Sequence, residues 1–248
     1  KMMNVSFSGC GFLGIYHLGV AKTLVSEGKK FVNMISRFGG SSAGALIASL
    51  LAIHGPNEDA IELCRQFCID LAEEIKSKTF GVLTPGVELL NPIAKFLEDS
   101  FTRCSYQGFR LGLFISVTNA ESKENEIISE FSSRDQLIKF LLASSCVPYI
   151  TNSKSIRIGN KRYFDGGLTN NMPLFYEGET ICVSPFEGKH EICPSISQPK
   201  TSPFASSFAT SSSSSSFTLS ASGLYPIDRS HVTFANQNFK VVRCVGGV

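Results

Sequence analysis

The chain has little net charge, no long hydrophobic run and few histidines. Its 23 Lys and Arg residues nearly balance its 21 Asp and Glu residues, which leaves a formal charge of +2. A basic surface of the kind that binds nucleic acid is therefore not expected. No apolar stretch reaches the roughly 20 residues that a membrane-spanning helix needs. The first residues lead directly into a strand-like segment, so we expect no signal peptide.

Eight cysteines are present, but none of them form a C-x-x-C pair. The absence of that spacing argues against a zinc knuckle and against a thioredoxin-type redox motif. Several cysteines, such as Cys146 and Cys182, lie in apolar runs, as buried reduced thiols do. We therefore expect a reducing, cytoplasmic compartment and no metal site.

The 248 residues, of which 43% are hydrophobic and 18% charged, are enough for one large domain. Strand-like and helix-like segments alternate, which predicts an α/β class with three layers, α/β/α, around a mostly parallel central sheet. Strands are predicted at residues 4–8, 31–35 (with its end at 37–40), 110–118, 125–131, 162–164 and 179–185. Helices are predicted at residues 15–27, 45–54, 57–78, 91–101 and 134–144.

The composition changes at about residue 195. Residues 195–222 are dominated by Ser, Thr, Ala and Phe, and positions 211–216 are all Ser. Such a stretch cannot build a hydrophobic core. The sequence therefore predicts a globular domain over residues 1–194 and a Ser-rich, disordered tail over residues 195–248.

A G-x-S-x-G motif, Gly40-Ser41-Ser42-Ala43-Gly44, stands between a predicted strand and a predicted helix. In this context the motif is typical of a sharp turn that exposes a serine nucleophile. Gly40 and Gly44 would be needed because strand and helix pass too closely for a Cβ. The alternative is an ordinary tight β–α turn, so the interpretation depends on partners elsewhere in the chain.

A glycine-rich loop follows the first predicted strand, with the sequence Gly9-Cys10-Gly11-Phe12-Leu13-Gly14. G-x-G-x-x-G is the fingerprint of a dinucleotide site, as in a nicotinamide-dependent oxidoreductase. That site also needs an acidic residue at the end of the second strand, where residues 37–40 carry none. The loop could instead supply backbone N–H groups as an oxyanion hole, or simply allow close helix packing. With the serine motif nearby, we favour the oxyanion hole.

A serine nucleophile needs a base, and none of the four histidines stands in a context that indicates catalysis: His17, His54, His190 and His231. A triad of Ser42, Asp165 and His190 would follow the α/β-hydrolase order. That fold, however, needs more strands before its elbow than the residues preceding Ser42 can supply.

Asp165 stands between an aromatic strand end and the pair Gly166-Gly167. One interpretation is a β-turn, since Asp-Gly favours turns. The other is a carboxylate that contacts the serine directly, acting as general base and then as general acid. Partial burial would raise its proton affinity and suit it to that task.

Four patterns occur in order: the glycine loop, G-x-S-x-G, Ala143-Ser144 with Pro148 (A-S-x-x-x-P), and Asp165-Gly166-Gly167. Together they resemble the patatin-like phospholipase family. Residues 9–14, 183–186 and 192–194 look most like its adipose triglyceride lipase and adiponutrin branch. The resemblance covers residues 5 to 194.

The resemblance implies a catalytic dyad of Ser42 and Asp165, with the loop Gly9 to Gly14 as oxyanion hole and no metal or organic cofactor. It implies hydrolysis of glycerolipid esters, triacylglycerol above all, by a cytoplasmic protein that works peripherally at lipid droplets or membranes. A protein coactivator would also fit. Phospholipase or acyltransferase chemistry on the same dyad, and a noncatalytic lipid-binding role, remain as alternatives.

The chain departs from the family pattern at two loop positions, with Cys10 in place of Gly and Leu13 in place of Arg or Lys. Backbone donors survive both changes. Beyond Pro194 the likeness to the branch ends, which puts attachment to droplets in question.

Candidates for an acyl pocket are apolar residues near the motifs: Phe12, Leu13, Phe80, Val82, Leu83 and Leu89. Residues 87–97 are amphipathic and could be a lid or a packed helix.

Overall fold

The computed structural model describes residues 2–26, 28–77, 88–102, 112–148, 150–151, 155–194, 227–234 and 237–244. The strands are β1 (Met3–Phe7), β2 (Ile35–Ser41), β3 (Gly112–Asn119), β4 (Asn125–Ile128), β5 (Ile156–Ile158), β6 (Lys161–Asp165), β7 (Glu179–Val183), β8 (Ile227–Phe234) and β9 (Gln237–Cys244). The α-helices are α1 (Gly14–Ser26), α2 (Lys29–Val32), α3 (Ala43–His54), α4 (Glu58–Lys76), α5 (Leu90–Phe101) and α6 (Arg134–Ser144).

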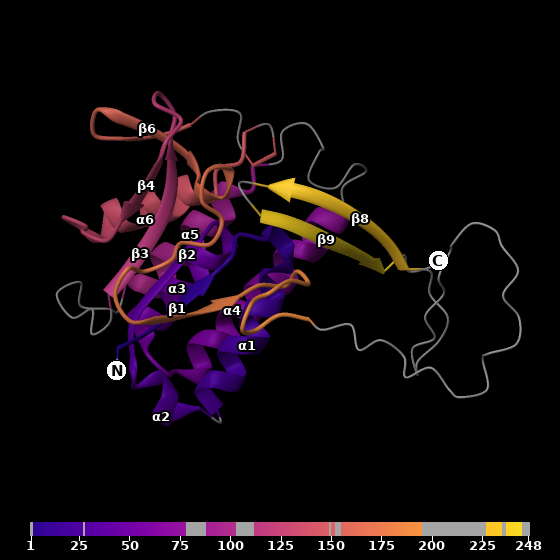
Figure 1. The fold of residues 1–248 in the computed structure, drawn as a ribbon. Coiled ribbons are helices and arrows are strands. Elements are labelled where there is room, and N and C mark those ends of the chain that lie inside the picture. The colour runs from indigo at the N-terminus through magenta and orange to yellow at the C-terminus, as the bar shows by residue number, and fades with distance from the viewer. Residues whose placement is uncertain are drawn as a thin grey trace, which may run out of the picture.

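A seven-stranded sheet forms the centre of the fold, in the order β5-β6-β3-β2-β1-β7, with β4 also paired to β3. The four strands β3, β2, β1 and β7 run parallel. The strands β4, β5 and β6 extend this sheet with antiparallel pairings. In Figure 1 the sheet extends from β6 near the top to β1 below it. The predicted α/β class and mostly parallel sheet are confirmed.

Helices pack on one face of the sheet, where the strands present their apolar side chains. Phe38 lies beside Val5 on one side and Leu113 on the other, and all three side chains are buried. Helix α3 packs against β1, β2 and β3, and α6 packs against β3, β5 and β6. Helix α1 packs against α3 and α4, and α5 packs against α4 and α6. Burying this face supplies the main stabilisation of the fold, at roughly 25 cal/mol per Å² of apolar surface.

The opposite face carries small and polar residues and is covered by the irregular segment 166–178. Ser116 Oγ on β3 donates to the carbonyl of Asn170 at 2.8 Å. Arg37 on β2 forms an ion pair with Glu177 at 2.8 Å. Gly39 leaves room for Phe175, whose ring would lie 2.9 Å from a Cβ at that position. Within the part of the chain that the structure describes, this segment therefore forms the third layer, on the face of the sheet opposite the helices.

Most predicted elements are confirmed. Asn57 is the N-cap of α4, and its side chain accepts from the amides of Asp59 and Ala60. The predicted strand at 31–35 is wrong at its start, because residues 29–32 form α2 and the strand begins at Ile35. Strand β5 was not predicted. Within the described ranges, no helix is both long and apolar enough to cross a bilayer.

Residues 195–226, which include the serine run, lie outside the described residues. Strands β8 and β9, which follow them, pair as an antiparallel ladder from Ile227↔Cys244 to Phe234↔Gln237. The division into a globular domain over residues 1–194 and a disordered tail over residues 195–248 stays a prediction.

Substitution of Gly44 tests the close contact between β1 and α3. A Cβ on Gly44 would lie 2.3 Å from the carbonyl oxygen of Phe7, whereas a Cβ on Gly19 in α1 would meet nothing within 4 Å. We expect Gly44→Ala to destabilise the protein by at least about 2 kcal/mol, because backbone must move. The control Gly19→Ala should stabilise it by roughly 0.5–1 kcal/mol. Urea unfolding measures both, and equal effects would contradict this packing.

Candidate active site

Ser42 occupies the turn between β2 and α3 in a strained backbone conformation. Its φ is 53° and its ψ is −128°, a region that costs a non-glycine residue about 1–3 kcal/mol. Gly40 is required at this turn, since its Cβ would lie 2.5 Å from the carbonyl carbon of Gly44. The structure thus builds the sharp strand–turn–helix connection that the G-x-S-x-G motif predicts.

Ser144 holds this turn from the end of α6. The amide of Ser42 donates to Ser144 Oγ at 2.9 Å, and Ser144 Oγ in turn donates to the carbonyl of Ser116 on β3 at 2.7 Å. One buried hydroxyl therefore links the strained turn to the sheet. Sequence reasoning missed this role of Ser144, for which membership of the A-S-x-x-x-P pattern was the only signal.

Asp165 lies at the end of β6 and is almost fully buried, with 3% of its surface exposed. Its Oδ1 accepts hydrogen bonds from the amide of Gly167 at 2.7 Å and from Ser41 Oγ at 3.3 Å. Burial raises the pKa of Asp165 to about 6, against the opposing effects of the Ser42 hydroxyl, the Gly167 amide and the Ser41 hydroxyl. The carboxyl can thus change protonation near neutral pH.

The two glycines after Asp165 are needed for close approach. A Cβ on Gly166 would lie 2.1 Å from the carbonyl oxygen of Ser116, and one on Gly167 would lie 3.0 Å from Asp165 Oδ1. The Asp-Gly-Gly turn therefore brings the carboxylate against β3 and supplies its amide donor.

The glycine loop forms a single 3₁₀ turn, Gly11–Leu13, before α1 begins at Gly14. Three of the six backbone amides in the predicted oxyanion loop already donate hydrogen bonds within the protein. The Gly9 amide donates to the carbonyl of Asn171, the Leu13 amide to that of Cys10, and the Gly14 amide to that of Gly11. The amides of Cys10, Gly11 and Phe12 have no acceptor among the described residues. The predicted oxyanion hole is thereby narrowed to these three donors.

Two side chains outside the predicted set fix the start of the loop. Asn171 Nδ2 donates to the carbonyl of Gly9 at 3.1 Å, and the Gly9 amide returns a bond to the Asn171 carbonyl at 3.2 Å. His17 is fully buried, and its Nε2 donates to the carbonyl of Ser8 at 2.8 Å. Burial lowers the pKa of His17 to about 4, so the ring is neutral.

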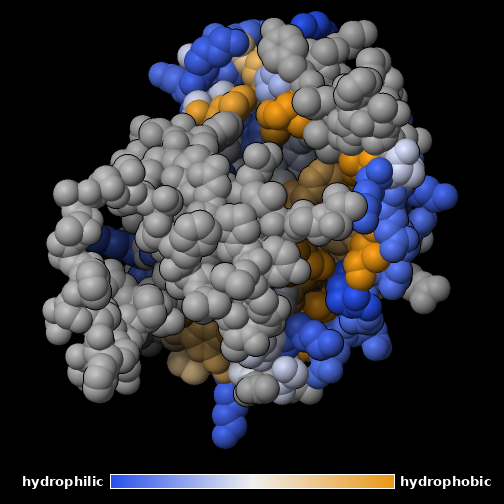
Figure 2. Space-filling model, turned by 90° about the vertical axis from the view of Figure 1, so that its right-hand side faces the viewer, coloured by the Kyte–Doolittle hydropathy of each residue, from blue (hydrophilic) through white to orange (hydrophobic). Residues whose placement is uncertain are grey.

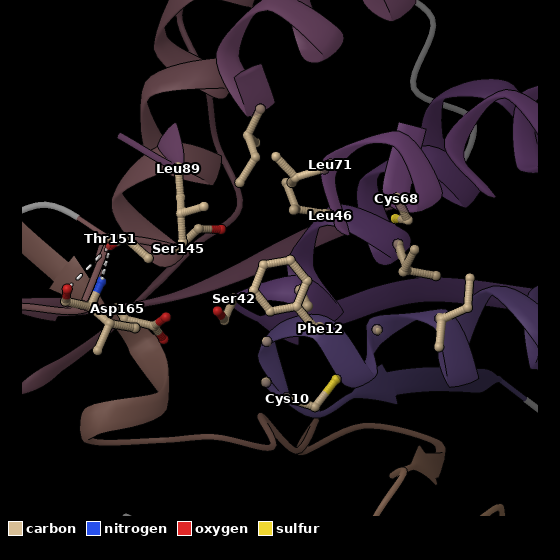
Figure 3. Close-up of a pocket in the computed structure, with 18 of the residues that line it drawn as sticks. Cys10, Phe12, Ser42, Leu46, Cys68, Leu71, Leu89, Ser145, Thr151 and Asp165 are labelled. Atoms are coloured by element: carbon tan, nitrogen blue, oxygen red, sulfur yellow. Dashed lines mark hydrogen bonds between the residues drawn. The ribbon is translucent and has the colours of Figure 1, made fainter. Parts of the chain in front are cut away.

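Ser42, Asp165 and the loop open into one cavity of about 620 Å³. Figure 3 shows Ser42 and Phe12 facing it from one side and Asp165 and Ser145 from another. Its walls are mainly apolar and come from three helices: Leu46, Ile47 and Leu50 of α3, Phe67, Cys68 and Leu71 of α4, and Ile93, Phe96 and Leu97 of α5. Among the residues that the structure describes in this lining, none is Lys, Arg or His.

Only some of the residues predicted to form the acyl pocket line the cavity. Phe12 and Leu89 line the cavity, whereas Leu13 does not. Phe80, Val82 and Leu83 lie outside the described residues. Helix α5, in the predicted amphipathic stretch, is a packed wall, because its Leu97 and Phe101 are buried. Among the described residues, no group of three or more His, Cys, Asp or Glu side chains could hold a metal ion.

A serine elbow and a buried carboxyl group thus line one cavity, and similarity to known proteins identifies the family of this chain. The sequence model of the family described as patatin-like phospholipase matches residues 5–176. The chain belongs to this family.

Several curated relatives share most of this chain. Human patatin-like phospholipase domain-containing protein 4 is 43% identical over 194 residues, which cover 78% of this chain and 76% of that protein. Rat patatin-like phospholipase domain-containing protein 2 is 38% identical, over 77% of this chain and 39% of its own length. Mouse 1-acylglycerol-3-phosphate O-acyltransferase Pnpla3 is 32% identical, over 79% of this chain and 46% of its own length. The chain thus spans less than half of the latter two proteins.

The buried, neutral His17 predicts a pH-dependent stability. The unfolded histidine takes up a proton near pH 6.5, whereas the folded one does so only near pH 4. Between these values the unfolded state binds more protons, so the free energy of unfolding falls as the pH decreases. We expect the wild-type protein to lose about 2 kcal/mol more than His17→Gln between pH 7 and pH 5. Urea unfolding at both pH values measures this, and parallel losses would contradict it.

Proposed function

We propose that this chain is a serine lipid acyl hydrolase that cleaves glycerolipid esters with Ser42 as nucleophile and Asp165 as general base. The observation that carries the proposal is the shared, mainly apolar cavity, which is lined by Ser42, Asp165 and the loop residues Cys10, Gly11 and Phe12. Family membership supports acyl chemistry on lipids. It also favours the oxyanion interpretation of the glycine loop over the dinucleotide one.

The reaction would proceed in two halves. Ser42 Oγ attacks the ester carbonyl carbon while Asp165 accepts the hydroxyl proton, and the Cys10, Gly11 and Phe12 amides stabilise the oxyanion. Asp165 then returns the proton to the departing alkoxide, which leaves an acyl group on Ser42. Water attacks that acyl-enzyme, giving its proton to Asp165, and the Ser42–acyl bond breaks. Asp165 reprotonates Ser42 Oγ and restores the site.

The cavity favours a neutral ester such as triacylglycerol. Its apolar walls would bury acyl chains, and among the described lining residues no cationic side chain is available to bind a phosphate group. Within this described lining, Asp165 is the only carboxylate, and it would repel an anionic headgroup placed near the ester. We propose that the protein acts on such lipids at the surface of cytoplasmic lipid droplets or membranes.

Acyl transfer is the second candidate, because one relative carries the name of an acyltransferase. The acyl group on Ser42 would pass to an alcohol in place of water, with the same proton path through Asp165. The ratio of transferred to hydrolysed acyl groups, measured with a labelled ester and a monoacylglycerol acceptor, distinguishes the two.

Two substitutions test the dyad. Ser42→Ala and Asp165→Asn should each lower kcat for ester hydrolysis by at least about a thousandfold, because each removes a reacting group. The neighbouring Ser41→Ala is the matched control, with an expected loss below about tenfold, since it removes one hydrogen bond to the carboxylate. Turnover of a triolein emulsion measures all three. If Asp165→Asn keeps full activity and His190→Ala loses it, a histidine triad replaces the dyad.

Asp165 also predicts the pH profile. As a general base it works only when deprotonated, so log kcat/KM should fall with decreasing pH below about 6. Ser41→Ala removes a hydrogen bond that lowers this pKa, so the fall should begin at a higher pH. A profile recorded between pH 4.5 and 9 with a water-soluble ester tests this, and an unshifted profile in Ser41→Ala would contradict it.

A further inference from the structure

Large apolar side chains are exposed around the mouth of the cavity. Phe12, Leu13, Ile15 and Ile150, hereafter the mouth rim, are 45–49% exposed. Phe12, Ile15 and Ile150 also line the cavity, so they stand where its interior meets the surface. Leu13 lies between two of them in sequence and faces outward. On the face shown in Figure 2, hydrophobic residues are visible in several places beside hydrophilic ones.

The segment that carries most of this rim is uncharged. Residues 9–21 contain no Asp, Glu, Lys or Arg. Half-exposed apolar side chains clustered beside an apolar cavity are unfavourable in water and indicate a binding surface.

The loop is anchored at its base and open at its tip. Gly9 is paired with Asn171, and a Cβ on Gly14 would lie 3.1 Å from the Cβ of Ala43 at the start of α3. Gly11, by contrast, has a φ of 55° and open space around its Cβ position. The exposed tip can therefore enter another phase while its base stays on the sheet.

We propose that the mouth rim inserts among the acyl chains of a phospholipid-covered surface and docks the cavity onto it. This rests on the proposed function, because the partner is the phase from which the ester substrate comes. A protein or a second copy of this chain seated on the rim would close the cavity, whereas a lipid layer continues its apolar interior. The oxyanion donors of Cys10, Gly11 and Phe12 lie in the inserted segment, so docking places them at the lipid.

Vesicle binding tests the proposal without catalysis. Ser42→Ala protein is mixed with phosphatidylcholine vesicles, and the bound fraction is measured by flotation. Adding Leu13→Ser should lower the partition coefficient about tenfold, which corresponds to about 1.4 kcal/mol. Adding Ile15→Ser as well should lower it about a hundredfold. Leu13→Lys, a second substitution at the same exposed position, should match or exceed the loss of Leu13→Ser.

The matched control is Leu174→Ser. Leu174 is 66% exposed and belongs to the segment on the opposite face of the sheet. The partition coefficient of the Leu174→Ser variant should lie within about twofold of that of the parent. The proposal is overturned if the rim variants bind like the parent, if Leu174→Ser loses as much, or if the parent does not bind. If the rim variants lose binding but the wild-type protein hydrolyses no ester, docking stands and the proposed function fails. If the wild-type protein hydrolyses ester but the rim variants bind vesicles like the parent, the proposed function stands and docking fails.

Discussion

The site depends on the close approach of α3 to the ends of β1 and β2. That approach is possible only because Gly40 and Gly44 lack side chains, with backbone atoms 2.5 Å or less from where a Cβ would stand. It forces Ser42 to a positive φ, and Ser144 and Ser116 stabilise the turn with buried hydrogen bonds. The same approach puts the start of α3 beside the glycine loop. The close approach of α3 to the sheet thus determines the position of Ser42, the position of the glycine loop and the packing of the sheet together.

Asp165 completes this arrangement through its burial. A solvent-exposed carboxylate would be too weak a base to activate a serine, whereas a fully desolvated one without donors would stay protonated. Here burial raises the pKa, and the Ser42, Gly167 and Ser41 groups limit the rise to a value of about 6. His17 is engaged elsewhere, because its Nε2 donates to the carbonyl of Ser8. A two-residue mechanism is therefore consistent with the chemistry of this cavity.

Local sequence patterns predicted the helices well, because capping and periodicity are local: Asn57 caps α4, and α6 spans the predicted residues 134–144. The start of β2 was misplaced because residues 35–41 are poor in strand-forming side chains. Tertiary packing decides there, since Gly39 accommodates Phe175 and Gly40 accommodates α3. The parts played by Ser144 and Asn171 could not be predicted, because their partners lie 102 and 162 positions away. The glycine loop, G-x-S-x-G and Asp-Gly-Gly motifs nevertheless identified residues that meet in the cavity.

The most direct test of the central claim is to find which residue of the wild-type protein a fluorophosphonate ester modifies. After digestion, mass spectrometry should locate the adduct on Ser42, and prior incubation with a triacylglycerol emulsion should protect it. Ser41, which is one residue away but is bonded to Asp165 on a buried strand, should stay unmodified. An adduct on another residue, or continuing ester hydrolysis after Ser42 is fully modified, would contradict the account.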